Sequence, residues 1–338
     1  MAKKVGTYTI QMEQAPSVIG YAAVGSKREA AGPMAPYIDM LNEDSFFGQK
    51  SWELAESRMQ QEVAEIALKK ARLSPTEVDY VSAGDLLNQC IGSHYGLREL
   101  GVPFLGLYSA CATMAEGLGL AALLIDGGVG RHAMALTSSH FCASERQFRS
   151  PLAYGGQRPP TAQWTVTGAG AAIVGANTVP PYIKAVTIGS IEDKGVCDIA
   201  NMGAAMAPAA AQTLTRFFAD TMTNEKNYDM ILTGDLSLVG SELLYQLMDR
   251  DGYHIQDKHA DCGLMIYDNA AQDVDAGGSG CGCSAVVLCS HIMQAMRAGQ
   301  LGEVLFIATG ALMSTISVQQ KQSIPAVAHL VHLSANPA

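Results

Sequence analysis

A single cysteine at a predicted strand-to-helix boundary is the residue of this chain best placed for chemistry. Cys111 follows the apolar run 105–107 and precedes the alanine-rich stretch 112–125, which predicts a buried helix. The positive end of a helix lowers the pKa of a nearby thiol and attracts anions. We therefore expect Cys111 to be either a nucleophile or part of the floor of an anion-binding pocket. A small buried core residue is the alternative.

Two aspartates and a glycine-rich loop accompany this cysteine. Asp85 and Asp235 each close a short apolar segment, and Ser279 and Cys281 stand in the loop 277–281 ahead of another helical run. Ligands of α/β sheets bind beyond the carboxyl ends of the strands, so we expect these residues to meet near Cys111. The alternatives are aspartates that cap turns and a tight strand-to-helix connection. The loop matches neither a phosphate loop nor a dinucleotide fingerprint.

Other candidate side chains lie in two polar segments. His259 and Cys262 stand in 258–263, where a solvated histidine and a core cysteine are the alternatives to a site role. Arg146 and Arg149 form a basic group that can hold a carboxylate ligand, because guanidinium groups match carboxylates in a bidentate way. A surface loop paired with Glu145 is the alternative for these arginines.

Alternating strand-like and helical runs predict an α/β layered fold that contains an internal duplication. Helical stretches 52–71 and 205–221 each lead to an apolar segment that ends in Gly-Asp-Leu, at 79–86 and 229–236. Cys111 and Cys283 each begin a predicted helix that a strand follows. The strands that follow these helices are predicted at 133–137 and 304–309. A further strand is predicted at 264–267. The prolines at 180 and 181 suggest a seam, which gives halves 1–176 and 177–338.

Composition excludes several classes of function. The 338 residues are 48% hydrophobic and 16% charged, with 34 glycines, as expected of a globular protein. A net charge of −10 argues against a nucleic-acid partner. Eight cysteines without a CxxC pair predict no zinc site and fit a reducing compartment. No signal peptide and no membrane-spanning apolar run are expected.

Two of these segments resemble a known superfamily. The glycine-rich run 165–174 resembles the strand that closes the first half of thiolase-fold condensing enzymes, and the Ser-Ala-Cys-Ala turn at 109–112 resembles their nucleophile turn. The resemblance implies a thiolase-like fold, with two duplicated α/β halves in a layered α-β-α-β-α arrangement. It also implies a homodimer.

Longer segments resemble one family within that superfamily, the stage V sporulation AD proteins. They are 83–89, 145–149, 154–157, 202–211, 232–237, 261–267 and 277–281. This resemblance implies binding of dipicolinic acid (pyridine-2,6-dicarboxylic acid) for uptake into the developing spore through a membrane complex of stage V sporulation A proteins. It implies a location on the cytoplasmic side, peripheral to the forespore inner membrane. No cofactor is expected, and Ca²⁺ only as part of the ligand.

The departures from the condensing enzymes concern the helpers of the cysteine. Their histidine would align at Gly234 or Asp235, and their asparagine near Ser279. A thiolate that attacks a thioester needs an activating base or cation and donors for the oxyanion, so their loss predicts a non-catalytic protein. An acyl transferase with a thioester on Cys111, or an architectural channel subunit, is the alternative.

The binding hypothesis assigns a place to each candidate residue. Cys111 and Asp85 would line the floor of the pocket, near Asp235. The remaining candidates would form one wall and offset the charge of the ligand: Cys262, Ser279 and Cys281 in the wall, and Arg146, Arg149 or His259 against the charge.

Overall fold

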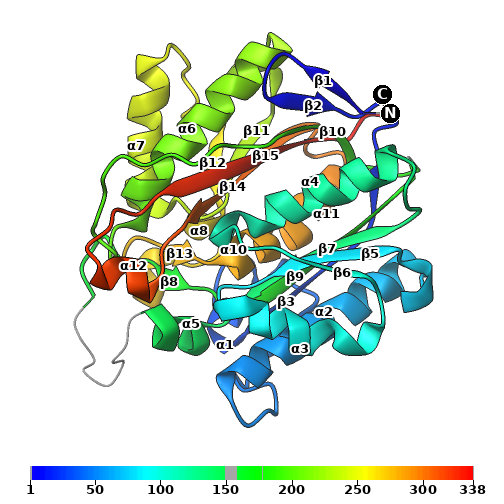
Figure 1. Ribbon diagram of the computed structural model, residues 1–338, viewed down its shortest axis with the longest axis horizontal. Coiled ribbons are helices and arrows are strands. Elements are labelled where there is room, and N and C mark those ends of the chain that lie inside the picture. Colours follow the sequence, from blue (N-terminus) through cyan, green and yellow to red (C-terminus); the bar gives the residue numbers. More distant parts are fainter. Residues whose placement is uncertain (1, 149–157, 177, 338) are drawn as a thin grey trace.

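The computed structural model describes residues 2–148, 158–176 and 178–337, which form five stacked layers. Figure 1 shows helices on both outer faces, the two halves of one large sheet beneath them and a middle layer of helices between those halves. The outer helices are α6 (Met202–Thr221) and α7 (Ser237–Arg250) on one side, and α2 (Trp52–Ala71) and α3 (Ile91–Leu97) on the other. The predicted α-β-α-β-α arrangement is confirmed.

The strand order is the same in the two halves of the chain. From edge to edge it is β12-β11-β14-β15-β10-β3-β9-β7-β5-β6. The first set is β3 (Ser17–Ser26), β9 (Gly168–Gly175), β7 (Ala133–Ser139), β5 (Tyr80–Gly84) and β6 (Phe104–Gly106). The second set is β10 (Tyr182–Thr187), β15 (Ala326–Ser334), β14 (Glu303–Ala311), β11 (Met230–Thr233) and β12 (His259–Asp261).

Pairing directions repeat as well. In each set an antiparallel trio is followed by two strands parallel to its last member. A pair between Ser17 and Tyr182 joins the sets at their centre. The predicted duplication is therefore present. The boundary after residue 176 falls between β9 and β10 and stays a prediction.

The outer helices begin where their capping residues allow. Helix α2 has the predicted bounds, and the Ser51 side chain caps its first turn. Helix α6 begins at Met202, three residues before the predicted start, because the Asn201 side chain caps it there. Each helix leads into a strand, β5 or β11, whose carboxyl end carries a candidate aspartate.

The middle helices both begin at candidate cysteines. Helix α4 (Thr113–Asp126) follows one 3-10 turn, Ala110–Ala112, that contains Cys111. Helix α10 (Cys281–Val287) starts two residues before the predicted Cys283. The same edge of the fold therefore receives one cysteine from each half.

Helix α10 has an unusual start and an unusual end. Gly280 precedes it with φ of 103°, and a Cβ there would lie 2.6 Å from Ser139 Oγ, so this position requires glycine. The helix continues through a π-helical turn, Leu288–Ile292, into α11 (Met293–Arg297).

The strand predicted at 264–267 is wrong. The strand there is β12, His259–Asp261, and the apolar residues that follow form helix α8 (Cys262–Met265). The Asp261 side chain accepts a hydrogen bond from the Leu264 backbone N–H, 3.2 Å away, and caps that helix. A capping carboxylate before the apolar run therefore ends the strand early.

The remaining elements are short. They are β1 (Lys3–Val5), β2 (Thr9–Gln11), β4 (Met40–Asn42), β8 (Trp164–Thr165), β13 (Gly278–Ser279), α1 (Lys27–Ala30), α5 (Phe141–Phe148), α9 (Asn269–Gln272) and α12 (Thr315–Gln319). None of the helices in the described ranges has both the length and the apolar character that crossing a bilayer demands.

Candidate functional site

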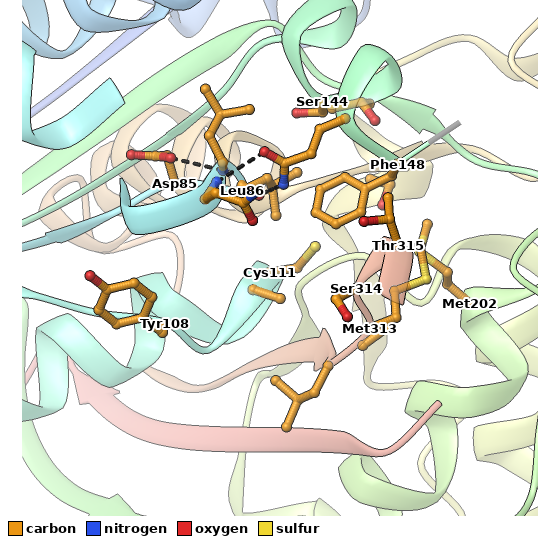
Figure 2. Close-up of a pocket in the computed structure, with 18 of the residues that line it drawn as sticks. Asp85, Leu86, Tyr108, Cys111, Ser144, Phe148, Met202, Met313, Ser314 and Thr315 are labelled. Atoms are coloured by element: carbon orange, nitrogen blue, oxygen red, sulfur yellow. Dashed lines mark hydrogen bonds between the residues drawn. The ribbon is translucent and has the colours of Figure 1, made fainter. Parts of the chain in front are cut away.

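A cavity of about 520 Å³ lies at the carboxyl ends of β5 and β6, beside the end of β14. Figure 2 shows Cys111 near its centre, with Asp85 and Tyr108 toward one side and Phe148, Met202 and Met313 toward the other. Both halves of the chain line it, through residues 85–89, Tyr108, Ala110, Cys111, Ser144, Glu145, Gln147, Phe148, Thr165, Met202, Ser279, 311–315 and Ser317. Among the described residues, no Lys, Arg or His belongs to this lining.

The Cys111 thiol is buried and lies between a carboxylate and a backbone amide. The neighbouring groups that act on its pKa include the Asp235 carboxyl and the Gly280 N–H, and that N–H donates its hydrogen bond to Asp235 Oδ2. Burial raises the pKa of this thiol well above its usual range, and the charge of Asp235 raises it further. The expected lowering of this pKa by the helix start is wrong, because desolvation outweighs the helix dipole. At neutral pH the side chain is a thiol.

Asp235 is fully buried at the turn after β11. Its carboxylate accepts hydrogen bonds from Ser279 Oγ (3.1 Å), Gly280 N–H (2.9 Å) and Thr309 Oγ1 (3.1 Å). Burial nevertheless raises the pKa of Asp235, and these donors oppose the rise. The resemblance places the histidine of the condensing enzymes at Gly234 or Asp235 and their asparagine near Ser279, and here Asp235 and Ser279 are hydrogen-bonded to each other.

Asp85 directly follows β5 and contributes a carboxyl to the cavity lining. Oδ1 accepts from the Leu87 N–H (2.9 Å), and Oδ2 accepts from the Ser93 N–H (2.8 Å) and Ser93 Oγ (2.7 Å). Burial raises the pKa of Asp85, while these hydrogen bonds lower it. Of the residues predicted to meet at one cavity, Asp85, Cys111 and Ser279 line it, whereas Asp235 and Cys281 do not belong to its lining. Their role in ligand binding stays a prediction.

Asp261 holds the turn that carries Asp235. Its oxygens accept from the Leu236 and Ser237 backbone N–H groups, at 2.8 and 2.9 Å. Burial raises the pKa of Asp261 to about 6. Asp261 thus supports the site from behind and is absent from the cavity lining.

His259 and Cys262 lie away from the cavity. The His259 ring lies between Thr233 Oγ1 (2.8 Å) and the Tyr245 hydroxyl (2.9 Å), and burial lowers its pKa to about 4. Cys262 is fully buried in the core. Neither lines the cavity, and a neutral imidazole offsets no ligand charge.

Cys281 supports the turn that contains Cys111. Its thiol donates to the Ala110 carbonyl oxygen at 3.1 Å. The side chain is fully buried and does not belong to the lining. Its position fits a second layer behind the wall.

The predicted basic group does not reach the cavity through Arg146. That side chain forms an ion pair with Glu53 and lies over the Trp52 ring, outside the lining. Arg149 lies outside the described residues. Arg158 instead pairs with Glu145 at 2.9 Å, and Glu145 lines the cavity. Within the described ranges, no group of three or more His, Cys, Asp or Glu side chains could hold a metal ion.

Sequence reasoning missed the aromatic and thioether side chains of the cavity. Phe148 and Met202 belong to segments that carry the family resemblance, so that signal could have selected them. Tyr108 directly precedes the cysteine turn. Met313 lies in the loop after β14, where the sequence shows no motif.

Hydrogen bonds from Gln147 of α5 hold the loop 86–89, which lines the cavity, and Figure 2 marks them. Gln147 Nε2 donates to the Leu86 carbonyl oxygen (3.1 Å), and Gln147 Oε1 accepts from the Asn88 N–H (2.9 Å). One side chain therefore fixes two backbone groups of the cavity wall.

Comparisons with solved structures agree with this architecture. The 3-oxoacyl-[acyl-carrier-protein] synthase III from Aquifex aeolicus VF5 has a TM-score of 0.58 at 12% identity, over 94% of this chain and 99% of that one. A single-substitution variant of Xanthomonas campestris OleA has a TM-score of 0.60 at 14% identity, over 96% of this chain and 99% of that one. At these identities the similarity establishes the thiolase-like fold alone.

Sequence comparisons are more specific. The family model for Stage V sporulation protein AD (SpoVAD) matches residues 6–334. Stage V sporulation protein AD of Bacillus subtilis (strain 168) is 43% identical over 327 residues, which cover 97% of this chain and 96% of that protein. This chain therefore belongs to the stage V sporulation protein AD (SpoVAD) family.

Proposed function

We propose that this chain binds dipicolinic acid in the Cys111 cavity without forming a covalent bond to it. The state of Cys111 carries the non-covalent part of the proposal. Its thiol is buried, burial and the charge of Asp235 raise its pKa, and the described lining has no imidazole to take its proton. Nucleophilic cysteines need the opposite surroundings. The family resemblance supports the identity of the ligand.

The cavity has the size and the mixed lining that a flat aromatic dicarboxylate requires. Its volume of about 520 Å³ lies in the usual range for small-molecule sites. Tyr108, Phe148 and Met202 offer apolar faces to a pyridine ring. Hydroxyl and amide groups offer donors to carboxylates, and they belong to Asn88, Gln89, Ser144, Gln147, Thr165, Ser314 and Thr315.

The charge of the lining favours the calcium chelate of dipicolinate over the free dianion. A dianion would face Asp85 without a cation from the described lining, and Glu145 is already paired with Arg158. A one-to-one chelate has no net charge, and dipicolinate supplies three of its metal ligands, the ring nitrogen and two carboxylate oxygens. Asp85 and neighbouring oxygens suit the open positions of Ca²⁺, which prefers oxygen ligands.

Calorimetric titration tests this proposal with calcium dipicolinate, and with dipicolinate in the presence of a chelator. We expect saturable one-to-one binding, tighter for the calcium form. Cys111→Ala should weaken it about tenfold, as expected for the loss of one well-packed contact. Cys197→Ala, at an exposed cysteine, is the matched control. Asp85→Ala should weaken binding more strongly when calcium is present. Absence of heat and of any shift in melting temperature would favour a purely architectural subunit.

An acyl transferase that uses Cys111 is the second candidate function. It is favoured by the likeness of the fold to condensing enzymes and by the position of Cys111 in the cavity lining. Incubation with acyl-CoA followed by intact-mass measurement tests it. A covalent acyl adduct that disappears in Cys111→Ala would overturn the binding-only proposal.

The partners and the location extend the same proposal. The family suggests a peripheral protein on the cytoplasmic side of the forespore inner membrane, held by other stage V sporulation A proteins. A homodimer would form through the edge strand β6, where Leu105 is exposed. Capture of the purified partner proteins by this chain tests the first point.

A further inference from the structure

A buried chain of hydrogen bonds runs from helix α2 to the aspartate of the cavity. Glu56 and Gln60, one helical turn apart, are both fully buried. Ser138 Oγ donates to Glu56 Oε1 at 2.9 Å. Gln60 Nε2 donates to Ser138 Oγ (2.8 Å) and to Ser93 Oγ (2.9 Å), and Ser93 Oγ donates to Asp85 Oδ2 (2.7 Å). The chain therefore links two carboxyls through one amide.

The number of available protons fixes the direction of every bond in this chain. The Gln60 amide has two N–H protons, and the two serines take both. Each serine has one hydroxyl proton, and it goes to a carboxyl oxygen. Both carboxyls must therefore be acceptors where the chain meets them. A proton on either carboxyl must therefore sit on the oxygen of that carboxyl that the serine does not contact.

The two carboxyls differ at their remaining positions. Asp85 has donors on both oxygens, because Oδ1 accepts from the Leu87 N–H at 2.9 Å. Glu56 Oε2 has no hydrogen-bond partner in the described structure although it is buried, and Gln60 Oε1 is also without one. An ionised buried carboxylate with a single donor is strongly unfavourable. A proton on Glu56 Oε2 removes that charge and adds a donor on the helix face that also carries Gln60.

The surroundings of Glu56 supply no positive charge. The charge of Asp85, which follows β5, raises the pKa of Glu56. The charge of Glu56 in turn raises the pKa of Cys90, before α3, and of Cys281, on α10. Burial raises the pKa of Glu56 well above its usual range, and the charge of Asp85 raises it further. No described Lys, Arg or His lies within ion-pair distance of Glu56.

The two carboxyls are also close in space. A Cβ built on Gly92 would lie 3.1 Å from Asp85 Oδ2 and 3.2 Å from Glu56 Cγ. The charge of His94, which lies on the same helix as Gly92, lowers the pKa of Asp85. The Arg146 side chain of α5 forms its ion pair with Glu53 instead. Two negative charges at this separation would repel each other, so one carboxyl stays neutral.

We propose that Glu56 is a neutral, protonated acid and that the Gln60–Ser93 arm holds Asp85 as the charged carboxylate of the cavity. Glu56, Gln60 and Ser93 are then positioning residues that assign one negative charge to the ligand side of the pair. The ligand used to test this rests on the proposed function above, but the assignment of the proton does not.

The ligand-free protein tests the assignment of the proton. Infrared difference spectra at neutral pH, wild type minus Glu56→Gln, should contain the carbonyl stretch of one protonated carboxyl. Glu77→Gln, at an exposed glutamate, is the control and should not remove that band. The absence of the band from the wild-type spectrum would mean that Glu56 is ionised and would overturn the proposal.

The pH dependence of calcium dipicolinate binding tests the arm to Asp85. Ser93→Ala removes one donor from this carboxylate, so the pH at which binding is lost on acidification should rise by about one unit. Ser57→Ala, at a serine of α2 that bonds to the Glu53 carbonyl outside the chain, should not move it. Titration of the ligand itself is the same for all three proteins.

The outcomes are separable. Equal loss of affinity at every pH in Ser93→Ala, with an unmoved midpoint, would mean a merely structural role and would overturn the arm. If the wild type binds no dipicolinate, the proposed function fails. The infrared measurement then decides the assignment of the proton on its own.

Discussion

Replacing His259 by glutamine tests whether this imidazole carries a charge that a ligand could use. The partly buried ring lies between Thr233 Oγ1 and the Tyr245 hydroxyl, and desolvation lowers its pKa from 6.5 to about 4. The folded protein then keeps His259 neutral over a pH range in which the unfolded chain protonates it. Stability is consequently lost as the pH falls through that range.

The magnitude follows from the difference between the two pKa values. A difference of about 2.5 units corresponds to about 3 kcal/mol of unfolding free energy, lost between pH 6.5 and pH 4. Asp261 acts in the opposite direction. Burial raises its pKa from 3.8 to about 6, so the folded state gains about 3 kcal/mol as the pH falls from 6 to 3.8. In the wild type the two contributions nearly cancel, and His259→Gln leaves the gain from Asp261 unopposed.

Urea unfolding at pH 7 and pH 4 measures this effect. The stability of the wild type relative to His259→Gln should decrease by about 3 kcal/mol between the two pH values. His254→Gln, at a mostly exposed ring, controls for the loss of a histidine. A difference between wild type and His259→Gln that is equal at both pH values would refute the argument. It would mean that His259 is charged in the folded protein.

Three further outcomes follow from the site and its surroundings. Gly280→Ala should lower the unfolding free energy by about 3 kcal/mol, because φ is 103° and the new Cβ meets Ser139 Oγ; an unchanged urea midpoint would contradict the glycine requirement. Iodoacetamide at pH 8 should label exposed Cys197 and spare Cys111 in the native protein, and peptide mass mapping would reveal rapid labelling of Cys111 as evidence against its raised pKa. Leu105→Lys on edge strand β6 should convert the proposed dimer to monomer in size-exclusion chromatography without loss of helical circular dichroism, and a persistent dimer would exclude that interface.

Local sequence patterns predicted most of the fold. Helix α2 has the predicted bounds because its apolar spacing and its Ser51 cap agree. The repeated Gly-Asp-Leu strand ends predicted the duplication and brought Asp85 to the cavity with Cys111. One local signal was missed. Asp261 caps the helix that begins at Cys262 by accepting from the Leu264 N–H three residues further along the chain, so the strand expected at 264–267 does not form.

The protonation states and the far wall could not be predicted from the sequence. The pKa of Cys111 depends on burial and on Asp235, which comes from the other half of the chain. His259 looked solvated in a polar segment, but β12 places it in the sheet beside β11. Met313 lies in a loop without a motif, and only the folded chain brings it opposite Asp85.

A crystal structure of this chain with calcium dipicolinate tests the central claim most directly. We predict a planar ligand in the cavity, its metal beside the Asp85 carboxylate and its ring against Tyr108, Phe148 or Met202, with the Cys111 sulfur unmodified. A ligand bound elsewhere, or a cavity that stays empty at saturating ligand, would contradict the account.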